Sequence, residues 1–299
     1  MTVAKNEFCY RVAGHLFRLT APERLACLAH YEPFLADGSG NELFHLTIAA
    51  KKNGQDEESE GEGEQGRQIG SFADASATIE VYAGKNGGYT FHIAPPGGKR
   101  CGVIVTSADY KSTHVYFEGD PRYHSFALDN GLMLLFAFAS APHDTLMIHA
   151  SVVKHDGKGY LFLGRSGTGK STHSRLWLEH IGGCELLNDD NPIARVVDGN
   201  AIVYGSPWSG KTPCYKNESA TIGGIVRLQQ KPENHVELLS MAQAFAAFKP
   251  SCSTAPWDRT VHDGICNTLT TLLQQVNTYT LGCRPDREAA LLCHQTVAR

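Results

Sequence analysis

The feature that most constrains this chain is the segment 164–171, which has the sequence Gly-Arg-Ser-Gly-Thr-Gly-Lys-Ser. Two glycines separated by four residues and followed by Lys and Ser form the phosphate-binding loop pattern. Residues 159–163 form a short apolar and aromatic run typical of a buried strand, and 172–180 can continue as a helix because they include neither Gly nor Pro. This order of strand, loop and helix predicts a nucleotide phosphate site in an α/β fold.

Each residue type in the loop is suited to binding a phosphate group or its metal ion. Glycines let successive backbone amides turn toward an anion, and the N-terminus of the following helix adds the positive end of its dipole. Lys170 is expected to reach the β- and γ-phosphates of ATP, and the Ser171 hydroxyl is expected to bind Mg²⁺. The rest of the expected cradle consists of Gly164, Ser166, Gly167, Thr168 and Gly169. A plain glycine-rich turn is the alternative, but it would not need the Lys-Ser ending.

A second feature is the short apolar run 186–190, Leu-Leu-Asn-Asp-Asp, which ends in paired carboxylates. We expect a neighbouring parallel strand here, with its C-terminal end facing the same crevice as Lys170. One carboxylate would hold the metal while the other takes a proton from an acceptor hydroxyl. Which of Asp189 and Asp190 has which role stays open, because adjacent strand residues point to opposite faces unless the strand end twists. A solvated turn before Pro192 is the alternative.

These motifs, in this order, resemble a known family. Four segments carry the resemblance: Ile148-His149-Ala150-Ser151, the turn at Asp156-Gly157, the loop at 164–171, and Asn188-Asp189-Asp190. They are similar to the catalytic core of HPr serine kinase and of its relative, the ATP-dependent phosphoenolpyruvate carboxykinase. The resemblance implies a mixed α/β P-loop core over 121–299. It also implies that His149 matches the kinase histidine on the strand before the loop, and that Asp190 or Asp189 matches the catalytic carboxylate.

The chain also departs from both enzymes. We find neither the signature stretch that follows the Asp pair in HPr kinase nor the arginines and lysine that hold oxaloacetate in the carboxykinase. Residues 205–213 stand in their place, a loop rich in turn formers with one cation, Lys211. Lys211 is a candidate to stabilise the γ-phosphoryl oxygens, and Trp208 a candidate to stack on a base or exclude water. The alternatives are a surface turn with a buried Trp208 and a solvated Lys211 and, for His149, a core histidine in place of a catalytic one.

The composition indicates a globular enzyme that binds neither nucleic acid nor membranes. A chain of 299 residues with 42% hydrophobic content can bury a core, and a net charge of −4 offers no clustered cations for a phosphate backbone. Nine cysteines without a Cys-x-x-Cys pair are typical of reduced thiols in a cytoplasmic protein. The most apolar stretch, 132–141, is too short to cross a bilayer and predicts a buried helix on a sheet.

The chain is expected to divide into a β-rich N-terminal domain, 1–120, and a nucleotide-binding domain similar to HPr kinase and the carboxykinase, 121–299. In the first domain we expect strands at 44–49, 77–82, 88–93 and 102–106, and a disordered acidic loop at 53–68. In the second we expect helices at 122–141, 240–248 and 285–297, a strand at 278–281 and a further element at 268–276.

The sequence therefore predicts an ATP- and Mg²⁺-dependent phosphotransferase that acts on a hydroxyl of a protein, a peptide or a small molecule. A non-catalytic ATP-binding regulatory module is an alternative, because binding and catalysis share the loop. Phosphoenolpyruvate carboxykinase activity is a further alternative, but it needs a convergent Arg and Lys set and a second metal site. The resemblance also implies assembly into homo-oligomers.

Overall fold

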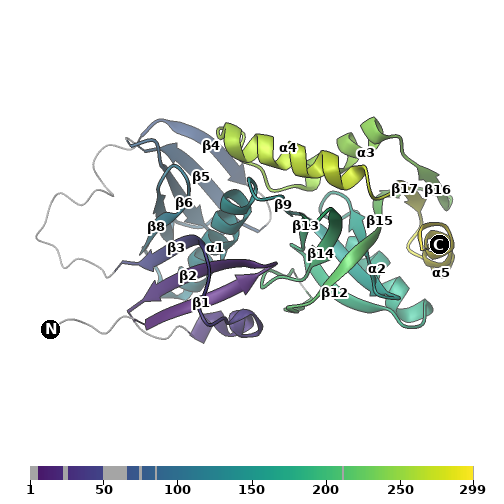
Figure 1. The fold of residues 1–299 in the computed structure, drawn as a ribbon, viewed down its shortest axis with the longest axis horizontal. Coiled ribbons are helices and arrows are strands. Elements are labelled where there is room, and N and C mark those ends of the chain that lie inside the picture. The colour runs from purple at the N-terminus through teal and green to yellow at the C-terminus, as the bar shows by residue number, and fades with distance from the viewer. Residues whose placement is uncertain are drawn as a thin grey trace, which may run out of the picture. The chain divides into compact units, whose positions relative to one another are not determined.

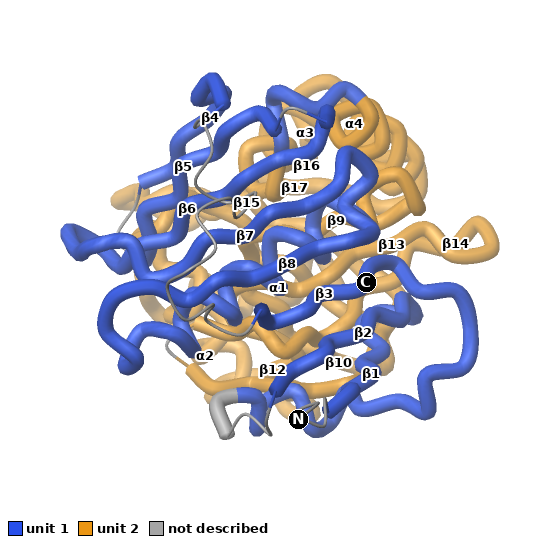
Figure 2. Tube along the Cα trace, turned by 90° about the vertical axis from the view of Figure 1, so that its left-hand side faces the viewer, with its two compact units in different colours: residues 1–139, 255–259 blue, residues 140–254, 260–299 orange. Residues whose placement is uncertain are grey.

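The computed structural model describes residues 6–22, 26–49, 66–73, 76–84, 86–210 and 212–298. The chain forms two compact units (Figure 2): Met1–Ala139 with Ala255–Arg259, and Ser140–Thr254 with Thr260–Arg299. Each unit has its own sheet (Figure 1). The fold class is mixed α/β with a β-rich N-terminal half, as expected. The domain boundary after residue 120 stays a prediction.

The first unit contains an eight-stranded sheet in the order β1-β2-β3-β8-β7-β6-β5-β4. Its strands are β1 (Asn6–Val12), β2 (His15–Ala21), β3 (Glu42–Ile48), β4 (Gln68–Ala73), β5 (Thr78–Ala83), β6 (Tyr89–Ala94), β7 (Gly102–Thr106) and β8 (Ser112–Phe117). β3 pairs in parallel with β2 and β8, and the other pairs are antiparallel. The helical segments are the 3₁₀ turns η1 (Ala26–Phe34) and η2 (Pro121–Tyr123) and the helix α1 (His124–Ser140).

Helix α1 packs on this sheet. Leu132 and Phe136 are fully buried, and the Phe136 ring meets Phe17 of β2 with centroids 6.3 Å apart. A Cβ at Gly131 would stand 2.2 Å from the Ile104 side chain of β7, so a residue without a side chain lets the helix approach the sheet. The prediction of a buried helix from the apolar stretch 132–141 is confirmed. Among the described residues, no helix is long and apolar enough to cross a membrane.

The sequence located β3, β5, β6 and β7 to within two residues but assigned no position to β1, β2, β4 and β8. β8 shows why, because it begins with the polar residues Ser, Thr and His, so no apolar run marks its start. The predicted disordered loop at 53–68 lies outside the described residues except for 66–68, and Gln68 begins β4.

The second unit contains a nine-stranded, curled sheet with the main path β12-β10-β11-β15-β14-β13-β9. Its strands are β9 (Thr145–Met147), β10 (Ala150–His155), β11 (Lys158–Leu163), β12 (Glu185–Asp190), β13 (Ile193–Val197), β14 (Asn200–Tyr204), β15 (Ser219–Gln230), β16 (His235–Leu238) and β17 (Thr278–Cys283). The long β15 branches the sheet, because one part of it pairs with β14 and another with β17. The helical segments are α2 (Lys170–His180), α3 (Met241–Phe248), the 3₁₀ turn η3 (Lys249–Ser251), α4 (Arg259–Leu273) and α5 (Arg287–Val297).

Two-residue turns form the hairpins of this sheet. Asp156 and Gly157 have φ angles of 47° and 74° between β10 and β11, and Asp198 and Gly199 have 49° and 75° between β13 and β14. Positive φ at both positions is the turn geometry that matches strand twist, and Asp-Gly is a preferred pair for it. The predicted turn at Asp156-Gly157 is therefore confirmed, and it sets the register of the strand that leads into the phosphate-binding loop.

The expectation that β12 is a parallel neighbour of β11 is wrong, because β10 lies between them and pairs antiparallel with both. β11 and β12 still run in the same direction. Ala150 at the start of β10 is paired with Leu163 at the end of β11 and with Asp190 at the end of β12. The loop, the Asp pair and the residue before Ala150 therefore meet at one edge of the sheet, where ligands of α/β sheets bind.

The core under α2 contains a buried histidine. Trp177 is fully buried and its ring meets Phe162 of β11 with centroids 5.3 Å apart, while Ala290 and Cys293 of α5 belong to the same cluster. Trp177 Nε1 donates to His173 Nε2 at 3.1 Å, so this nitrogen must be unprotonated. Burial lowers the pKa of His173 to about 4.

His173 is expected to make stability depend on pH. Below its unfolded pKa of about 6.5 the unfolded chain binds a proton that the folded chain does not, so stability falls until the folded pKa of about 4 is reached. We expect His173→Gln to remove roughly 3 kcal/mol of this loss between pH 7.5 and pH 4, at about 1.4 kcal/mol per pKa unit. Urea unfolding at several pH values measures it, with His180→Gln at the end of the same helix as the control. Identical pH profiles for wild type and His173→Gln would contradict the expectation.

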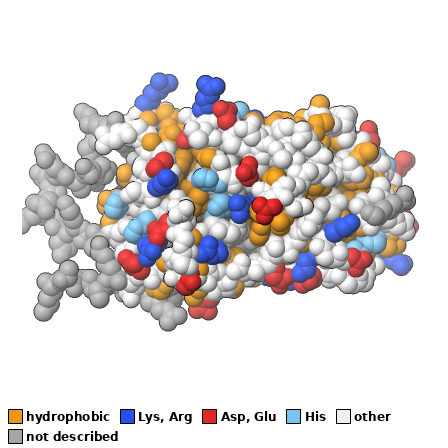
Figure 3. Space-filling view, in the orientation of Figure 1, with side chains coloured by type: hydrophobic (Ala, Val, Ile, Leu, Met, Phe, Trp, Pro, Cys, Tyr) orange, Lys and Arg blue, Asp and Glu red, His pale blue; other side chains and the backbone are white. Residues whose placement is uncertain are grey.

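Charged side chains of both signs are interspersed on the face drawn in Figure 3. The expected absence of nucleic-acid and membrane partners stays a prediction, as do homo-oligomer assembly and a cytoplasmic location.

Candidate functional site

The phosphate-binding loop connects β11 to α2. Gly167 and Gly169 have φ angles of 79° and 106°, which favour glycine, and no atom lies within 4 Å of a Cβ built at either position. No side chain caps the first turn of α2, so its amides remain suited to an anion. Thr168 closes the loop on itself, because its N and Oγ donate to Arg165 O at 3.1 and 2.7 Å.

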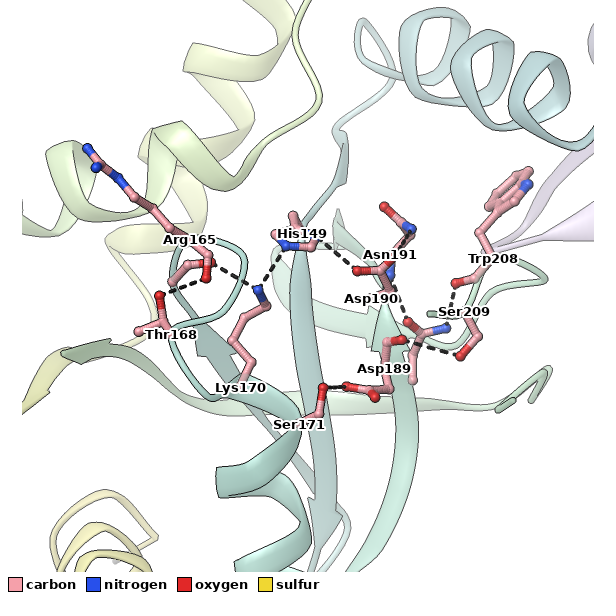
Figure 4. Close-up of polar contacts among 12 residues, drawn as sticks. His149, Arg165, Thr168, Lys170, Ser171, Asp189, Asp190, Asn191, Trp208 and Ser209 are labelled. Atoms are coloured by element: carbon pink, nitrogen blue, oxygen red, sulfur yellow. Dashed lines mark hydrogen bonds and ion pairs between the residues drawn. The ribbon is translucent and has the colours of Figure 1, made fainter. Parts of the chain in front are cut away.

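Lys170, His149 and Asp190 form a line at the mouth of this loop (Figure 4). Lys170 Nζ donates to Gly164 O at 3.0 Å and lies 2.8 Å from His149 Nε2, while His149 Nδ1 lies 3.0 Å from Asp190 Oδ1. Because an ammonium only donates, Nε2 of His149 accepts, and the ring proton is on Nδ1, which faces the carboxylate. Burial lowers the pKa of Lys170, and the charges of Asp190 and Asp189 oppose this effect.

The two adjacent carboxylates have different surroundings. Ser171 Oγ donates to Asp189 Oδ1 at 2.9 Å, and Asp189 is 5% exposed. The side chain of Asp190 is 36% exposed and faces His149. The structure therefore brings Asp189 to Ser171 and Asp190 to His149, a division that the sequence left open. The roles of these residues in binding and catalysis stay predictions.

An unusual backbone conformation separates the two aspartates. Asp190 has a φ of 147°, which residues other than glycine rarely adopt. The following loop supports it, because Gly210 N donates to Asp189 O at 2.6 Å and Ser209 pairs with Asp190. A Cβ on Gly210 would stand 3.0 Å from Asp189 O and 3.1 Å from Asp190 Cβ, so this approach requires glycine.

A buried polar network lies under the carboxylates. Asn188 Nδ2 donates to Ser206 Oγ and to Trp208 O, both at 3.2 Å, and Asn188 Oδ1 accepts from Asn191 N at 3.0 Å. Ser206 Oγ donates to Asn191 O at 2.6 Å and accepts from Trp208 N at 3.2 Å. Asn191 and Ser206 were not predicted from the sequence. The signal was the polar Asn188 directly after the apolar Leu186 and Leu187, since a buried amide needs partners.

Ser206→Ala is expected to destabilise the fold. Ser206 is fully buried, and its hydroxyl serves Asn188, Asn191 and Trp208 at once. Removing a buried partner of this kind costs about 1–3 kcal/mol in the free energy of unfolding. Urea denaturation measures the loss, and the exposed Ser219→Ala should change stability by less than about 0.5 kcal/mol. Equal effects of the two substitutions would show that the network adds nothing to stability.

The loop 205–213 yields one correction. Trp208 is 2% exposed, and in Figure 4 its ring points away from Asp189 and Asp190. The interpretation that Trp208 stacks on a base is therefore wrong, because the ring is buried in the protein. Lys211, the predicted cation for the γ-phosphoryl group, lies outside the described residues, so its role stays a prediction.

A cavity of about 570 Å³ opens beside the loop. One wall comprises 167–169 of the loop with Thr172, His173 and Leu176 of α2. The other comprises the ends of β15 and β17 and the segments after them, which include Lys231 and Arg284. A mostly apolar cavity of this size with a few polar groups is typical of a small-molecule site.

The site was also tested for its fit to a metal ion. Within the described ranges, no group of three or more His, Cys, Asp and Glu side chains is arranged to hold a metal. Mg²⁺ at nucleotide sites is held by one or two carboxylates together with phosphate oxygens and water. Ser171 and Asp189 supply a hydroxyl and a carboxylate of this kind, with their oxygens 2.9 Å apart. This donor set fits Mg²⁺.

No family model matches this chain, and no curated protein matches it. Among solved structures, the chain is similar to the Hpr(Ser) kinase/phosphatase from Coxiella burnetii, with a TM-score of 0.31 and 14% sequence identity, over 51% of this chain and 88% of that chain. A similarity this distant carries no argument about chemistry, so the function must be argued from the residues of the site.

Proposed function

We propose that this chain is an ATP- and Mg²⁺-dependent phosphotransferase that acts on a hydroxyl acceptor. The observation that carries the proposal is the line of Lys170, His149 and Asp190 at the mouth of the phosphate-binding loop. It joins a cation suited to phosphate oxygens with a carboxylate suited to an acceptor proton, and transfer of a phosphoryl group needs both.

The nucleotide would lie along the loop. The amides at the start of α2 would face its phosphates, and the cavity of about 570 Å³ next to 167–169 would take the nucleoside. Ser171 and Asp189 would hold Mg²⁺, whose charge neutralises phosphate oxygens during transfer. Lys170 would exchange His149 Nε2 for a phosphate oxygen, since an ammonium can donate to either.

Asp190 is the proposed general base. His149 Nδ1 at Oδ1 and Asn191 Nδ2 at Oδ2, both 3.0 Å away, fix the plane of this carboxylate. Each oxygen keeps a second lone pair, so the carboxylate can still accept a hydrogen bond from an acceptor hydroxyl. The 36% exposure of its side chain gives an acceptor access from solvent. His149 is then a positioning residue that holds the base and contacts the phosphate-binding lysine.

A non-catalytic ATP-binding regulatory module is the second candidate. It is favoured by the hydrogen bonds that close the loop. Lys170 donates to His149 and to Gly164 O, and Thr168 donates to Arg165 O. If these bonds persist with nucleotide present, Lys170 cannot follow a phosphoryl group during transfer. Binding without turnover would then be the function.

Radiolabelled ATP with Mg²⁺ separates these candidates. Purified protein is incubated with fractions of cell extract, and both ADP release and label transfer are followed, with Lys170→Ala and Asp190→Asn in parallel. Extract-dependent transfer that both substitutions abolish supports the phosphotransferase. Tight ATP binding without turnover in any fraction supports the regulatory module. ADP formation that depends on oxaloacetate would instead identify the carboxykinase reaction.

A further inference from the structure

Three side chains outside the proposed transfer site form a cluster in the second unit. Lys249 Nζ lies 3.0 Å from His262 Nε2 and 3.5 Å from Cys266 Sγ, and His262 Nε2 lies 3.8 Å from the same sulfur. His262 Nδ1 lies 3.3 Å from Asp263 Oδ1, which orients the ring. We refer to Lys249, His262 and Cys266 as the thiol cluster.

The thiol cluster has the chemistry of a reactive cysteine. The thiolate is the nucleophilic form of cysteine, and a neighbouring ammonium such as that of Lys249 stabilises it. Because Lys249 also donates to His262 Nε2, this nitrogen accepts, and His262 positions the ammonium beside the sulfur. Cys266 is partly exposed. The other partly exposed cysteines among the described residues are Cys9, Cys184 and Cys283, and burial raises the pKa of each, to about 11 for Cys184. A raised pKa lowers the fraction of reactive thiolate at these three cysteines at neutral pH.

A cavity borders the thiol cluster at Lys249. A cavity of about 440 Å³ is lined by Lys249 and Pro250, by Cys252, and by Phe245 and Ala246 of α3. Cys252 is itself buried, and burial raises the pKa of its thiol to about 12. A reagent that enters this cavity therefore meets a protonated thiol at Cys252 and the Lys249 ammonium that contacts Cys266.

The backbone next to Lys249 contacts the strand that leads to His149. His149 N donates to Ser251 O at 2.7 Å, and Ser253 N donates to Met147 O at 3.0 Å. Between these two hydrogen bonds, the backbones of Cys252 and Ile148 pair in an antiparallel β-bridge. Lys249 begins the 3₁₀ turn η3 that ends at Ser251. Lys249 and the Ser251 carbonyl that accepts from His149 N therefore belong to the same short turn.

We propose that Cys266 is a peroxide-sensitive modification site, and that its oxidation loosens the contact between Ser251 and His149. The Cys266 thiolate attacks hydrogen peroxide, so an S–O bond forms and the O–O bond breaks. Sulfur loses two electrons, and the departing hydroxide takes a proton and becomes water. The product is a sulfenic acid, which thiols reduce again. The added oxygen has to fit beside Lys249 Nζ, which lies 3.5 Å from this sulfur, so the contact between Lys249 and Cys266 must rearrange.

The proposed oxidation of Cys266 is tested by trapping the sulfenic acid. Wild-type protein is treated with hydrogen peroxide and dimedone, and all nine cysteines are quantified by peptide mass spectrometry. We expect the label at Cys266, and labelling about tenfold slower in Lys249→Met, because the charge-assisted contact is lost. Equal labelling of Cys184 and Cys266, or an unchanged rate in Lys249→Met, would overturn the assignment.

The coupling is tested by amide hydrogen exchange in peptides that contain His149, with and without peroxide. We expect exchange at His149 to rise roughly threefold to tenfold after oxidation, as for the weakening of one hydrogen bond. Cys266→Ser should abolish the rise and the matched Cys184→Ser should keep it. Unchanged exchange in labelled wild-type protein would overturn the coupling. No nucleotide is needed for either readout, so the result stands apart from the proposed phosphotransferase. Only an effect of oxidation on the transfer rate rests on that function.

Discussion

Lys170→Ala is expected to reduce ATP turnover by roughly 10²- to 10³-fold, the usual effect of removing one group that stabilises developing charge. Lys170 is the cation at the mouth of the loop, with Nζ 3.0 Å from Gly164 O and 2.8 Å from His149 Nε2. ATP affinity should fall as well, because the same ammonium would hold phosphate oxygens before transfer. Steady-state ADP release and titration calorimetry with ATP measure the two effects.

The fold itself should survive this substitution. Burial lowers the pKa of Lys170, so its charge is held at a cost in the absence of phosphate, and thermal stability should be unchanged or raised. Lys158→Ala is the matched control, since Lys158 is an exposed lysine at the start of β11, the strand that ends at the loop. ATP turnover by Lys170→Ala equal to that of Lys158→Ala would remove the basis for a nucleotide site in this loop.

Asp190→Asn is expected to lower phosphoryl transfer by roughly 10²- to 10⁴-fold, the usual contribution of a general base, while ATP binding is retained. Asparagine keeps the size and shape of the aspartate side chain, so the end of β12 should form as before. It loses the charge that would accept the acceptor proton. Transfer kinetics and ATP affinity, measured on the same preparation, separate the two effects.

Two further variants sharpen this test. Asp198→Asn is the matched control, because Asp198 is an aspartate that also has a positive φ, 49°, in the turn between β13 and β14. Asp189→Asn should show the opposite pattern, with a weakened dependence on Mg²⁺, because Asp189 is bound to Ser171. Loss of Mg²⁺ dependence in Asp190→Asn with normal behaviour in Asp189→Asn would reverse the proposed assignment of the two carboxylates.

The site shows where reasoning from the sequence succeeds and where it stops. The loop motif identified Lys170 and Ser171 because their spacing and their flanking strand and helix are local features. Asn191 and Ser206 were missed because their hydrogen bonds join β12 to a loop 15 residues later, a pairing that no periodicity in the sequence reports. For Trp208 the sequence left a buried ring and a ring stacked on a base as alternatives, since burial depends on segments that are distant in the chain.

In the fold, too, local features were predicted and contacts between distant segments were not. The Asp156-Gly157 turn, the helix after the loop and the buried helix α1 were predicted because each depends on contiguous residues. Strands β1, β2, β4 and β8 were not located individually, since polar residues interrupt each of them and leave no continuous apolar run. The placement of β10 between β11 and β12 could not be read from the sequence, because strand order depends on pairing between segments rather than on either segment alone.

The sequence by itself thus determined the chemistry that is available: a loop for phosphate, a hydroxyl and two carboxylates for a metal and a proton, and a histidine nearby. These are properties of residue types at short spacings, which backbone geometry fixes locally. Only the tertiary structure decided that Ala150 lies opposite both Leu163 and Asp190, which puts His149 between Lys170 and Asp190. It also decided that Lys249 contacts Cys266, and that Ser251, two residues after Lys249, accepts a hydrogen bond from the amide of His149. The physical reason is that such contacts depend on strand register and on packing between segments far apart in the chain.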